Sequence, residues 1–186
     1  FIENSPLSEA CRGVITVLDA LGLDVSSRNL KDYRAWFAEQ ETASHMDRVF
    51  KVAGLKCAVM TNDPFDPLER PVWEGDYQTD DRLHGVLRID PLLNAWGSSC
   101  DMLKGWGYDV EASLNTKTKA EVRRFLTDWV KRFKALYMAV SLPPDFALPE
   151  DSPRATIIEE CIVPVAREFN IPFAMMIGVT RQINPL

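Results

Sequence analysis

The chain has 186 residues, of which 46% are apolar and 26% charged, the balance of a soluble protein with one sizeable core. Its net charge of −6 argues against a nucleic-acid-binding surface, which needs a clustered excess of Lys and Arg. No apolar run approaches the length of a membrane span, and nothing resembles a signal peptide. We therefore expect a protein that binds neither nucleic acid nor membrane.

The cysteines are scattered and form no CxxC pair. Cys11 and Cys161 fall on apolar helical stripes and Cys57 within an expected strand, so we expect buried free thiols. Free thiols fit a reducing compartment, which predicts a cytoplasmic protein. The chain opens on Phe1 and stops at Leu186, and we expect it to be a piece of a longer protein.

Helices are expected throughout residues 1–54. Ser5 is the expected N-cap of the first, and its apolar stripe runs to a glycine stop. A second helix is expected near residues 28–40. A third is expected from Ser44, the start of a weak capping-box pattern, to Gly54. We expect these helices to form a region of their own.

From residue 55 onward, short apolar runs alternate with helical patterns. The expected strands are residues 55–61, 83–90, 135–142 and 171–179. Continuous apolar runs of this kind are typical of parallel strands that helices bury on both faces. Four such βα units fit either an open doubly wound sheet or part of a (β/α)8 barrel.

The barrel is favoured because no GxGxxG or Walker A pattern follows any strand. A whole barrel needs about 250 residues, so four strands are half of one. The sequence therefore predicts an α/β fold, a (β/α)8 TIM barrel of which residues 55–186 form a part.

The long helix expected at residues 118–134 has the clearest pattern. Thr118 and Glu121 match a capping box. Its predicted buried face consists of Val122, Phe125, Leu126, Trp129, Val130 and Phe133. A last helix is expected at about 153–169, and Pro164 should kink it.

Charged side chains gather where the strands end, and that is where a (β/α) barrel carries its chemistry. The segments after the strands read TNDPFD, RIDPLLN, SLPPDF and GVTRQIN. Asp63 and Asp66 are the candidate catalytic carboxylates, and general acid–base work would need a pKa raised by burial or by a neighbouring carboxylate. The alternative is a turn-and-cap role, because Asp-Pro commonly starts turns; Asp90 is likewise a plausible helix N-cap.

Arg88 and Arg181 end two apolar strands, where a buried guanidinium needs an anionic partner. They form a natural clamp for a carboxylate substrate. For Arg88, an internal pair with Asp90 is an equal alternative. Asn62, Asp90 and Asn184 stand at the same strand ends and complete the candidate substrate-binding residues.

Histidine is scarce. His45 lies in the first turn of an expected helix and is predicted to be an exposed surface residue. His84 begins a strand, which is the wrong end for a barrel site. Neither has a second histidine at ligand spacing, so we assign no metal ligand within this segment.

The motif VMTNDPFD resembles the strand-two motif TDDPxD of uronate isomerases, which belong to the amidohydrolase superfamily of (β/α)8 barrels. FAMMIGVTRQIN resembles the strand-five motif of the same family, and LRIDPLLN stands where that family has a Trp-Arg-Pro-Asp strand end. The residues before position 55 resemble the family's helical insertion. The chain also resembles a branch of TIM-barrel metal-dependent hydrolases.

The resemblance implies that the chain supplies strands two to five. It also implies a divalent metal, zinc in the first instance, with ligands mostly outside this segment, and isomerisation or hydrolysis of a sugar acid or related carboxylate. Asp63 and Asp66 take the strand-two acidic places, Arg88 the strand-three arginine and Arg181 the strand-five arginine. Asn62 stands where the family often has Asp.

One departure from the family pattern concerns Met176, which stands where relatives have a strand-five histidine. A thioether is a soft, weak donor for zinc. The alternative to a metal-dependent isomerase or hydrolase is therefore a degenerate barrel that binds a carboxylate ligand without metal. A homo-oligomer with the N-terminal helices as its interface is a further expectation.

Overall fold

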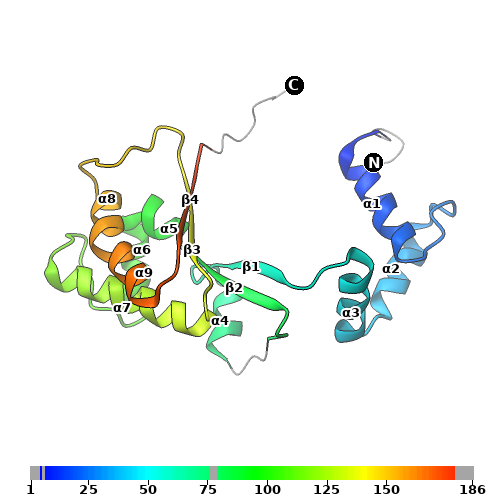
Figure 1. The fold of residues 1–186 in the computed structure, drawn as a ribbon, viewed down its shortest axis with the longest axis horizontal. Coiled ribbons are helices and arrows are strands. Elements are labelled where there is room, and N and C mark those ends of the chain that lie inside the picture. The colour runs from blue at the N-terminus through cyan, green and yellow to red at the C-terminus, as the bar shows by residue number, and fades with distance from the viewer. Residues whose placement is uncertain (1–4, 6, 76–78, 179–186) are drawn as a thin grey trace. The chain divides into compact units, whose positions relative to one another are not determined.

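The computed structural model describes residues 5, 7–75 and 79–178. The chain divides into two compact units, Phe1–Cys57 and Ala58–Leu186. Figure 1 shows the first unit in blue to cyan and the second from cyan to red. The roles predicted for residues 1–54 and 55–186, a helical insertion and a partial barrel, stay predictions.

The first unit is helical. Its helices are α1 (Glu9–Ala20), α2 (Leu30–Ala38) and α3 (Thr42–Ala53). Two predicted starts are wrong. Ser8, not Ser5, caps α1, because its Oγ accepts the Cys11 N–H at 3.2 Å. Glu41, not Ser44, caps α3, because its carboxylate reaches the first backbone N–H groups of that helix.

His45 is half-buried, so its prediction as an exposed residue is wrong. Its ring centroid lies 5.9 Å from that of Trp36 and 5.8 Å from that of Phe37, both edge to face. The guanidinium of Arg48 lies 5.5 Å from the Trp36 ring on the same cluster. Aromatic packing between α2 and α3 therefore covers the imidazole.

The second unit is built on a parallel sheet. In the part of the chain that the structure describes, four strands stand in sequential order: β1 (Ala58–Asn62), β2 (Leu83–Arg88), β3 (Met138–Leu142) and β4 (Phe173–Ile177). All neighbouring pairs are parallel. The predicted α/β class and its strands are confirmed. The described sheet is open, with β1 and β4 as its edges.

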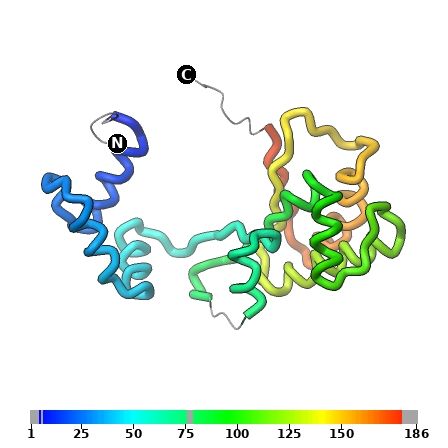
Figure 2. Tube along the Cα trace, turned by 180° about the vertical axis from the view of Figure 1, so that it is seen from behind, coloured from blue at the N-terminus to red at the C-terminus, as the bar shows by residue number. Residues whose placement is uncertain are grey.

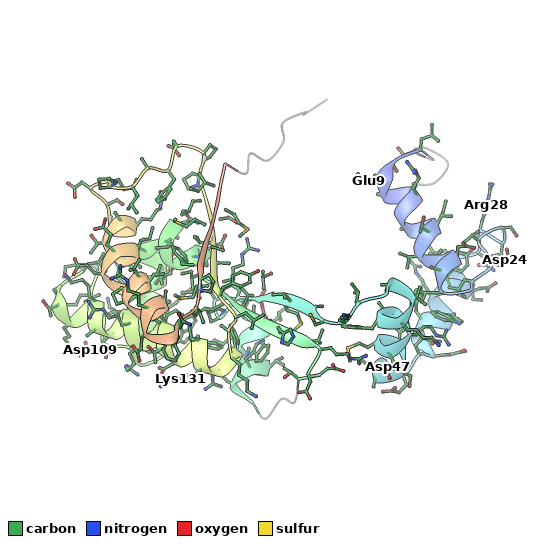
Figure 3. All side chains as sticks on the ribbon, in the orientation of Figure 1. Glu9, Asp24, Arg28, Asp47, Asp109 and Lys131 are labelled. Carbon is green, nitrogen blue, oxygen red and sulfur yellow. The ribbon has the colours of Figure 1, made fainter. Side chains whose placement is uncertain are left out.

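Helices connect the strands and gather on one side of the sheet, as Figures 1 and 2 show. They are α4 (Glu69–Glu74), α5 (Asp90–Asn94), α6 (Trp96–Gly105), α7 (Thr116–Phe133), α8 (Pro153–Ile157) and α9 (Val163–Phe169). Charged side chains such as Asp109 and Lys131 lie on the exposed side of this layer (Figure 3).

Helix α7 contributes one whole face to the core of this unit. All six residues of its predicted apolar face are buried, and Phe125 at their centre is fully buried. The predicted capping box is wrong: Asn115 caps α7 by accepting the Thr118 N–H at 2.9 Å. The Thr118 hydroxyl instead accepts the Glu111 N–H at 3.0 Å and is buried there.

The helix predicted at 153–169 is interrupted by a π-helical turn, Ile158–Ile162, just before Pro164. Proline lacks a backbone N–H, so a carbonyl in the preceding turn loses its usual partner. Arg123 of α7 donates from Nε to the Glu160 carbonyl at 2.6 Å. The structure thus shows a π-helical turn before Pro164, and the kink predicted at Pro164 stays a prediction.

Cys11, Cys100 and Cys161 are buried free thiols, as predicted for the first and last of them. Burial raises the pKa of Cys161 to about 11, so this thiol stays protonated. The prediction for Cys57 is wrong: it lies just before β1 and is exposed. Among the described residues, none of the helices is both long and apolar enough to cross a membrane.

Candidate functional site

The carboxyl ends of β1, β2 and β3 bring the predicted polar side chains to one edge of the sheet. Asn62 pairs with Leu87 in the register of β1 and β2, so Asp63 follows beside Arg88. Arg88 in turn pairs with Ala139 of β3. Because parallel strands end at a common edge, residues far apart in sequence meet here.

Arg88 and Asp90 form a two-point ion pair. Nε donates to Asp90 Oδ2 at 2.8 Å and Nη2 to Oδ1 at 3.1 Å. Ser141 joins the pair from β3, since its backbone N–H donates to Asp90 Oδ1 at 3.1 Å and its Oγ accepts from Arg88 Nη2 at 3.3 Å. The internal-pair alternative for Arg88 is therefore the one the structure shows.

This pairing also decides the local role of Asp90. The first turn of α5 has no side-chain cap, so the prediction of Asp90 as a helix N-cap is wrong. Its carboxylate faces Arg88 and the end of β3 instead. The hydrogen bond to Asp90 raises the pKa of Arg88, which therefore stays charged at the sheet edge.

Asp63 is the half-buried carboxylate of this edge. Burial raises its pKa most, and the charges of Asp90 and Glu69 raise it further. The Phe65 N–H, which donates to Oδ1 at 2.8 Å, and the charge of Arg88 act in the opposite direction. The turn predicted for Asp63-Pro64 is thus present, and the second carboxylate oxygen accepts no hydrogen bond from any residue that the structure describes.

Glu69, which we did not predict, organises the residues around Asp63. It is the first residue of α4 and accepts the Asp63 N–H at 3.0 Å. Its other oxygen accepts from the Asn62 amide and from the Trp73 indole, the latter at 3.2 Å. The spacing Asp66-x-x-Glu69 fits an acidic variant of the capping-box pattern, which signals the start of α4 but not the contact of Glu69 with Asp63.

Asn62 is 6% exposed, and its amide nitrogen is engaged by Glu69. Its Oδ1 is buried without a hydrogen-bond partner among the described residues. Asp66 is exposed, and its Oδ1 accepts the N–H groups of Leu68 at 2.7 Å and Glu69 at 3.1 Å. The structure therefore gives Asp66 the turn-and-cap role.

The last strand contributes Met176 to the same edge. Met176 pairs with Ser141 in the register of β3 and β4 and is 39% exposed. Arg181 and Asn184, the other two predicted substrate-binding residues, lie outside the described residues.

A divalent metal needs several converging donors, and a catalytic zinc has three protein ligands. Asp90 is engaged by Arg88, one oxygen of Asp63 is engaged by Phe65, and Met176 offers only a thioether. Within residues 5, 7–75 and 79–178, no cluster of three or more His, Cys, Asp or Glu side chains could hold a metal. The described residues do not by themselves fit a zinc site.

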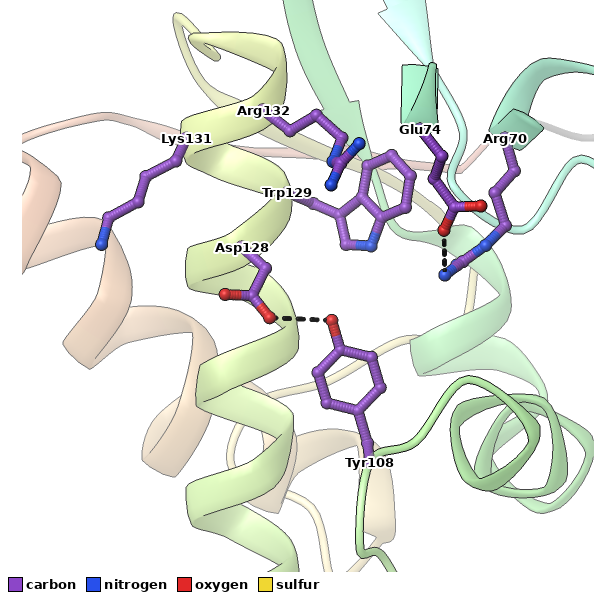
Figure 4. Close-up of a pocket in the computed structure, with 7 residues that line it drawn as sticks. All are labelled: Arg70, Glu74, Tyr108, Asp128, Trp129, Lys131 and Arg132. Atoms are coloured by element: carbon purple, nitrogen blue, oxygen red, sulfur yellow. Dashed lines mark hydrogen bonds and ion pairs between the residues drawn. The ribbon is translucent and has the colours of Figure 1, made fainter. Parts of the chain in front are cut away.

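A hollow away from the candidate site, shown in Figure 4, lies between α4, the chain before α7 and α7 itself. Its volume is about 430 Å³. Arg70 pairs with Glu74 at 2.6 Å and lies 3.6 Å from the Trp106 ring, while Tyr108 donates to Asp128 at 2.9 Å. Because these groups satisfy one another, we interpret this hollow as structural packing.

Among solved structures, the chain is similar to a uronate isomerase from Bacillus halodurans, with 50% sequence identity and a TM-score of 0.91. The match covers 100% of this chain and 44% of that one. The predicted resemblance to uronate isomerases is confirmed.

This chain spans less than half the length of the Bacillus uronate isomerase that it matches. No protein-family model matches the chain, and no curated protein does. The identity to that uronate isomerase extends over both units, because the match covers the whole chain.

Proposed function

We propose that this chain is part of a sugar-acid isomerase of the uronate isomerase type. The observation that carries the proposal is the 50% identity to a uronate isomerase over the whole chain. The carboxylate and guanidinium groups at the carboxyl edge of the sheet support it. The substrate class is then a small sugar acid, whose carboxylate offers a partner for a guanidinium.

We propose further that the sheet is one part of a closed (β/α)8 barrel. Doubly wound sheets reverse their strand order at a switch point, whereas the described strands run in sequential order without reversal. Large apolar side chains stand exposed on the edge strand β4: Met175, Met176 and Ile177. Strands from outside this segment would pair with that edge and cover those side chains.

In the proposed reaction, Asp63 moves the proton. Conversion of the aldehyde form of a sugar acid to its keto isomer removes one proton from C2 and adds one to C1, while a second proton passes from the C2 hydroxyl to the C1 oxygen. Asp63 is proposed to carry the first of these protons, accepting it from C2 and returning it to C1. Asp63 is suited to that task because its pKa is raised and one of its oxygens has no partner among the described residues. Asp66 supports the turn rather than reacting.

Arg88 is proposed to orient the substrate. Nε and Nη2 are held by Asp90, and Nη1 has no partner among the described residues, so the Nη1 N–H groups are left for an anionic ligand. Arg181 and Asn184 stay predictions as substrate-binding residues. A divalent metal also stays a proposal, with ligands from residues other than those described.

A second candidate function is a carboxylate-binding barrel that does not catalyse. Met176 favours it, because this thioether stands at the edge where the resemblance places a histidine. Turnover of D-glucuronate and D-galacturonate by the full-length protein, with and without added Zn²⁺, tests the first function. Calorimetric binding of the same sugars without turnover would support the second, and neither binding nor turnover would contradict both.

A further inference from the structure

The side chain of Glu69 bonds to two residues of the candidate site, Asn62 and Asp63, and not only to its own helix. Glu69 begins α4, and its side chain turns back to the end of β1. We infer that Glu69 is a positioning residue that holds the Asp63 backbone and places a fixed negative charge beside its side chain. This inference rests on the proposed function, because that proposal makes Asp63 the reacting carboxylate.

The geometry uses both oxygens of Glu69. Oε2 accepts the Asp63 N–H at 3.0 Å, and Oε1 accepts the Trp73 indole N–H at 3.2 Å as well as the Asn62 amide. Two of these donors belong to Asn62, the last residue of β1, and to Asp63, the residue after it. A carboxylate held by three donors has few alternative rotamers, so it fixes the chain to which it is bonded.

Asp66 holds the other side of Glu69. Its Oδ1 accepts the Glu69 backbone N–H at 3.1 Å. The turn from Asp63 to Glu69 is therefore held by two hydrogen bonds, one from the Asp63 N–H to the Glu69 carboxylate and one from the Glu69 N–H to the Asp66 carboxylate. The reacting residue Asp63 and its positioning residue Glu69 are therefore only six positions apart in the sequence. A displacement of about 1 Å at a reacting group can cost about 100-fold in rate.

The charge of Glu69 also acts on Asp63. It is one of the charges that raise the Asp63 pKa, after burial and Asp90. A neutral side chain of the same length at position 69 would lower the pKa of Asp63 toward its usual value. A residue that only supported the fold would leave this titration unchanged.

The test uses Glu69→Gln in the full-length protein, with Glu74→Gln as the matched control. Glu74 lies on the same helix but pairs with Arg70, away from the sheet edge. For E69Q we expect kcat to fall about 10- to 100-fold with KM changed less than about threefold. The limb of the kcat/KM profile that reports Asp63 should move to lower pH. E74Q should match the wild type in both.

A second readout does not need activity. Carboxyl-¹³C NMR of Asp-labelled protein, with Asp63 assigned from Asp63→Asn, should show Asp63 titrating at lower pH in E69Q than in the wild type. If the protein does not turn over uronates but this shift appears, the proposed function fails while the positioning by Glu69 stands. If E69Q titrates and turns over as E74Q does, the inference is overturned.

Glu69→Asp provides the second variant in case E69Q does not fold. It keeps the charge but shortens the side chain by one methylene, so it cannot reach the Asp63 N–H. Amide hydrogen exchange at Asp63 should then become about 10-fold faster or more than in E74Q. Equal exchange rates at Asp63 in the two variants would overturn the inference.

Discussion

Arg88 and Asp90 meet at two points at the end of β2, with Nε and Nη2 of the arginine 2.8 and 3.1 Å from the two carboxylate oxygens. The same carboxylate accepts the backbone N–H of Ser141 from β3. Two strand ends are therefore linked through one ion pair, which sets the direction of the guanidinium. A planar two-point donor fits this arrangement and an ammonium does not.

Arg88→Lys should therefore lower activity while the charge is kept. We expect kcat/KM to fall about 100-fold, because the lysine ammonium cannot bond both oxygens of Asp90 and also donate to the ligand as Nη1 of the arginine can. Arg124→Lys is the matched control, since Arg124 forms an exposed two-point pair with Glu121 on α7. Steady-state kinetics of both variants check the prediction, and equal losses in both would contradict it.

Asp63→Asn should lower turnover about 10²- to 10⁴-fold, the usual contribution of a general acid–base group. The Phe65 N–H can still donate to the Asn side chain, so the turn should be kept. The measurement is kcat on D-glucuronate. Wild-type turnover by the variant would remove Asp63 from the mechanism.

The same variant should be more stable than the wild type at neutral pH. The pKa of Asp63 is raised in the folded chain, so the folded state binds this proton more tightly than the unfolded state does. The contribution of Asp63 to the free energy of unfolding is then largest below its unfolded pKa of about 3.9, where the carboxyl is protonated. This contribution is lost as pH rises through the folded pKa. Urea unfolding across pH should show the gain of D63N at pH 7 and its disappearance in acid; a constant difference would contradict it.

Gly85→Ala should destabilise the second unit strongly. An added Cβ would lie 2.5 Å from the Phe133 carbonyl oxygen and 3.2 Å from the Phe133 Cβ, so backbone would have to move. We expect a loss of about 2 kcal/mol or more in the free energy of unfolding. Gly97→Ala on α6 is the control, since nothing lies within 4 Å of its Cβ, and it should gain up to about 1 kcal/mol. Denaturant unfolding that ranks the two in the opposite order would refute this packing.

Asn115→Ala should cost about 1 kcal/mol, because it removes the acceptor of the Thr118 N–H at the start of α7. Asn115→Ser, which keeps a capping oxygen, should lose much less. Thermal unfolding of the two variants measures the difference. Equal losses would show that Asn115 is not the cap.

The sequence predicts the strands because each contains a continuous apolar run, and it predicts the buried face of α7 because the apolar residues recur at helical spacing along the helix. Caps are harder, since several polar residues compete near each helix start: Ser5 and Ser8 both fit, and only the hydrogen bond to Cys11 distinguishes them. The edge at Asp63 and Arg88 is predictable because parallel strands end together.

Glu69 was not predictable as part of the site. Its role depends on the path of the turn from Asp63, which returns a helix residue to the strand that precedes it. The sequence likewise could not decide whether Arg88 pairs with Asp90 or with a substrate carboxylate, because that depends on the distance between the two side chains. The exposure of His45 was wrongly predicted for a similar reason, because Trp36 and Phe37, which partly bury its ring, lie on another helix.

The most direct test is a ¹H NMR time course of D-glucuronate with the full-length protein and with its Asp63→Asn variant. We expect the wild type to convert the sugar acid to its keto isomer and the variant to do so at least about 100-fold more slowly. An unchanged substrate spectrum with the wild type, or equal rates for the two proteins, would contradict it.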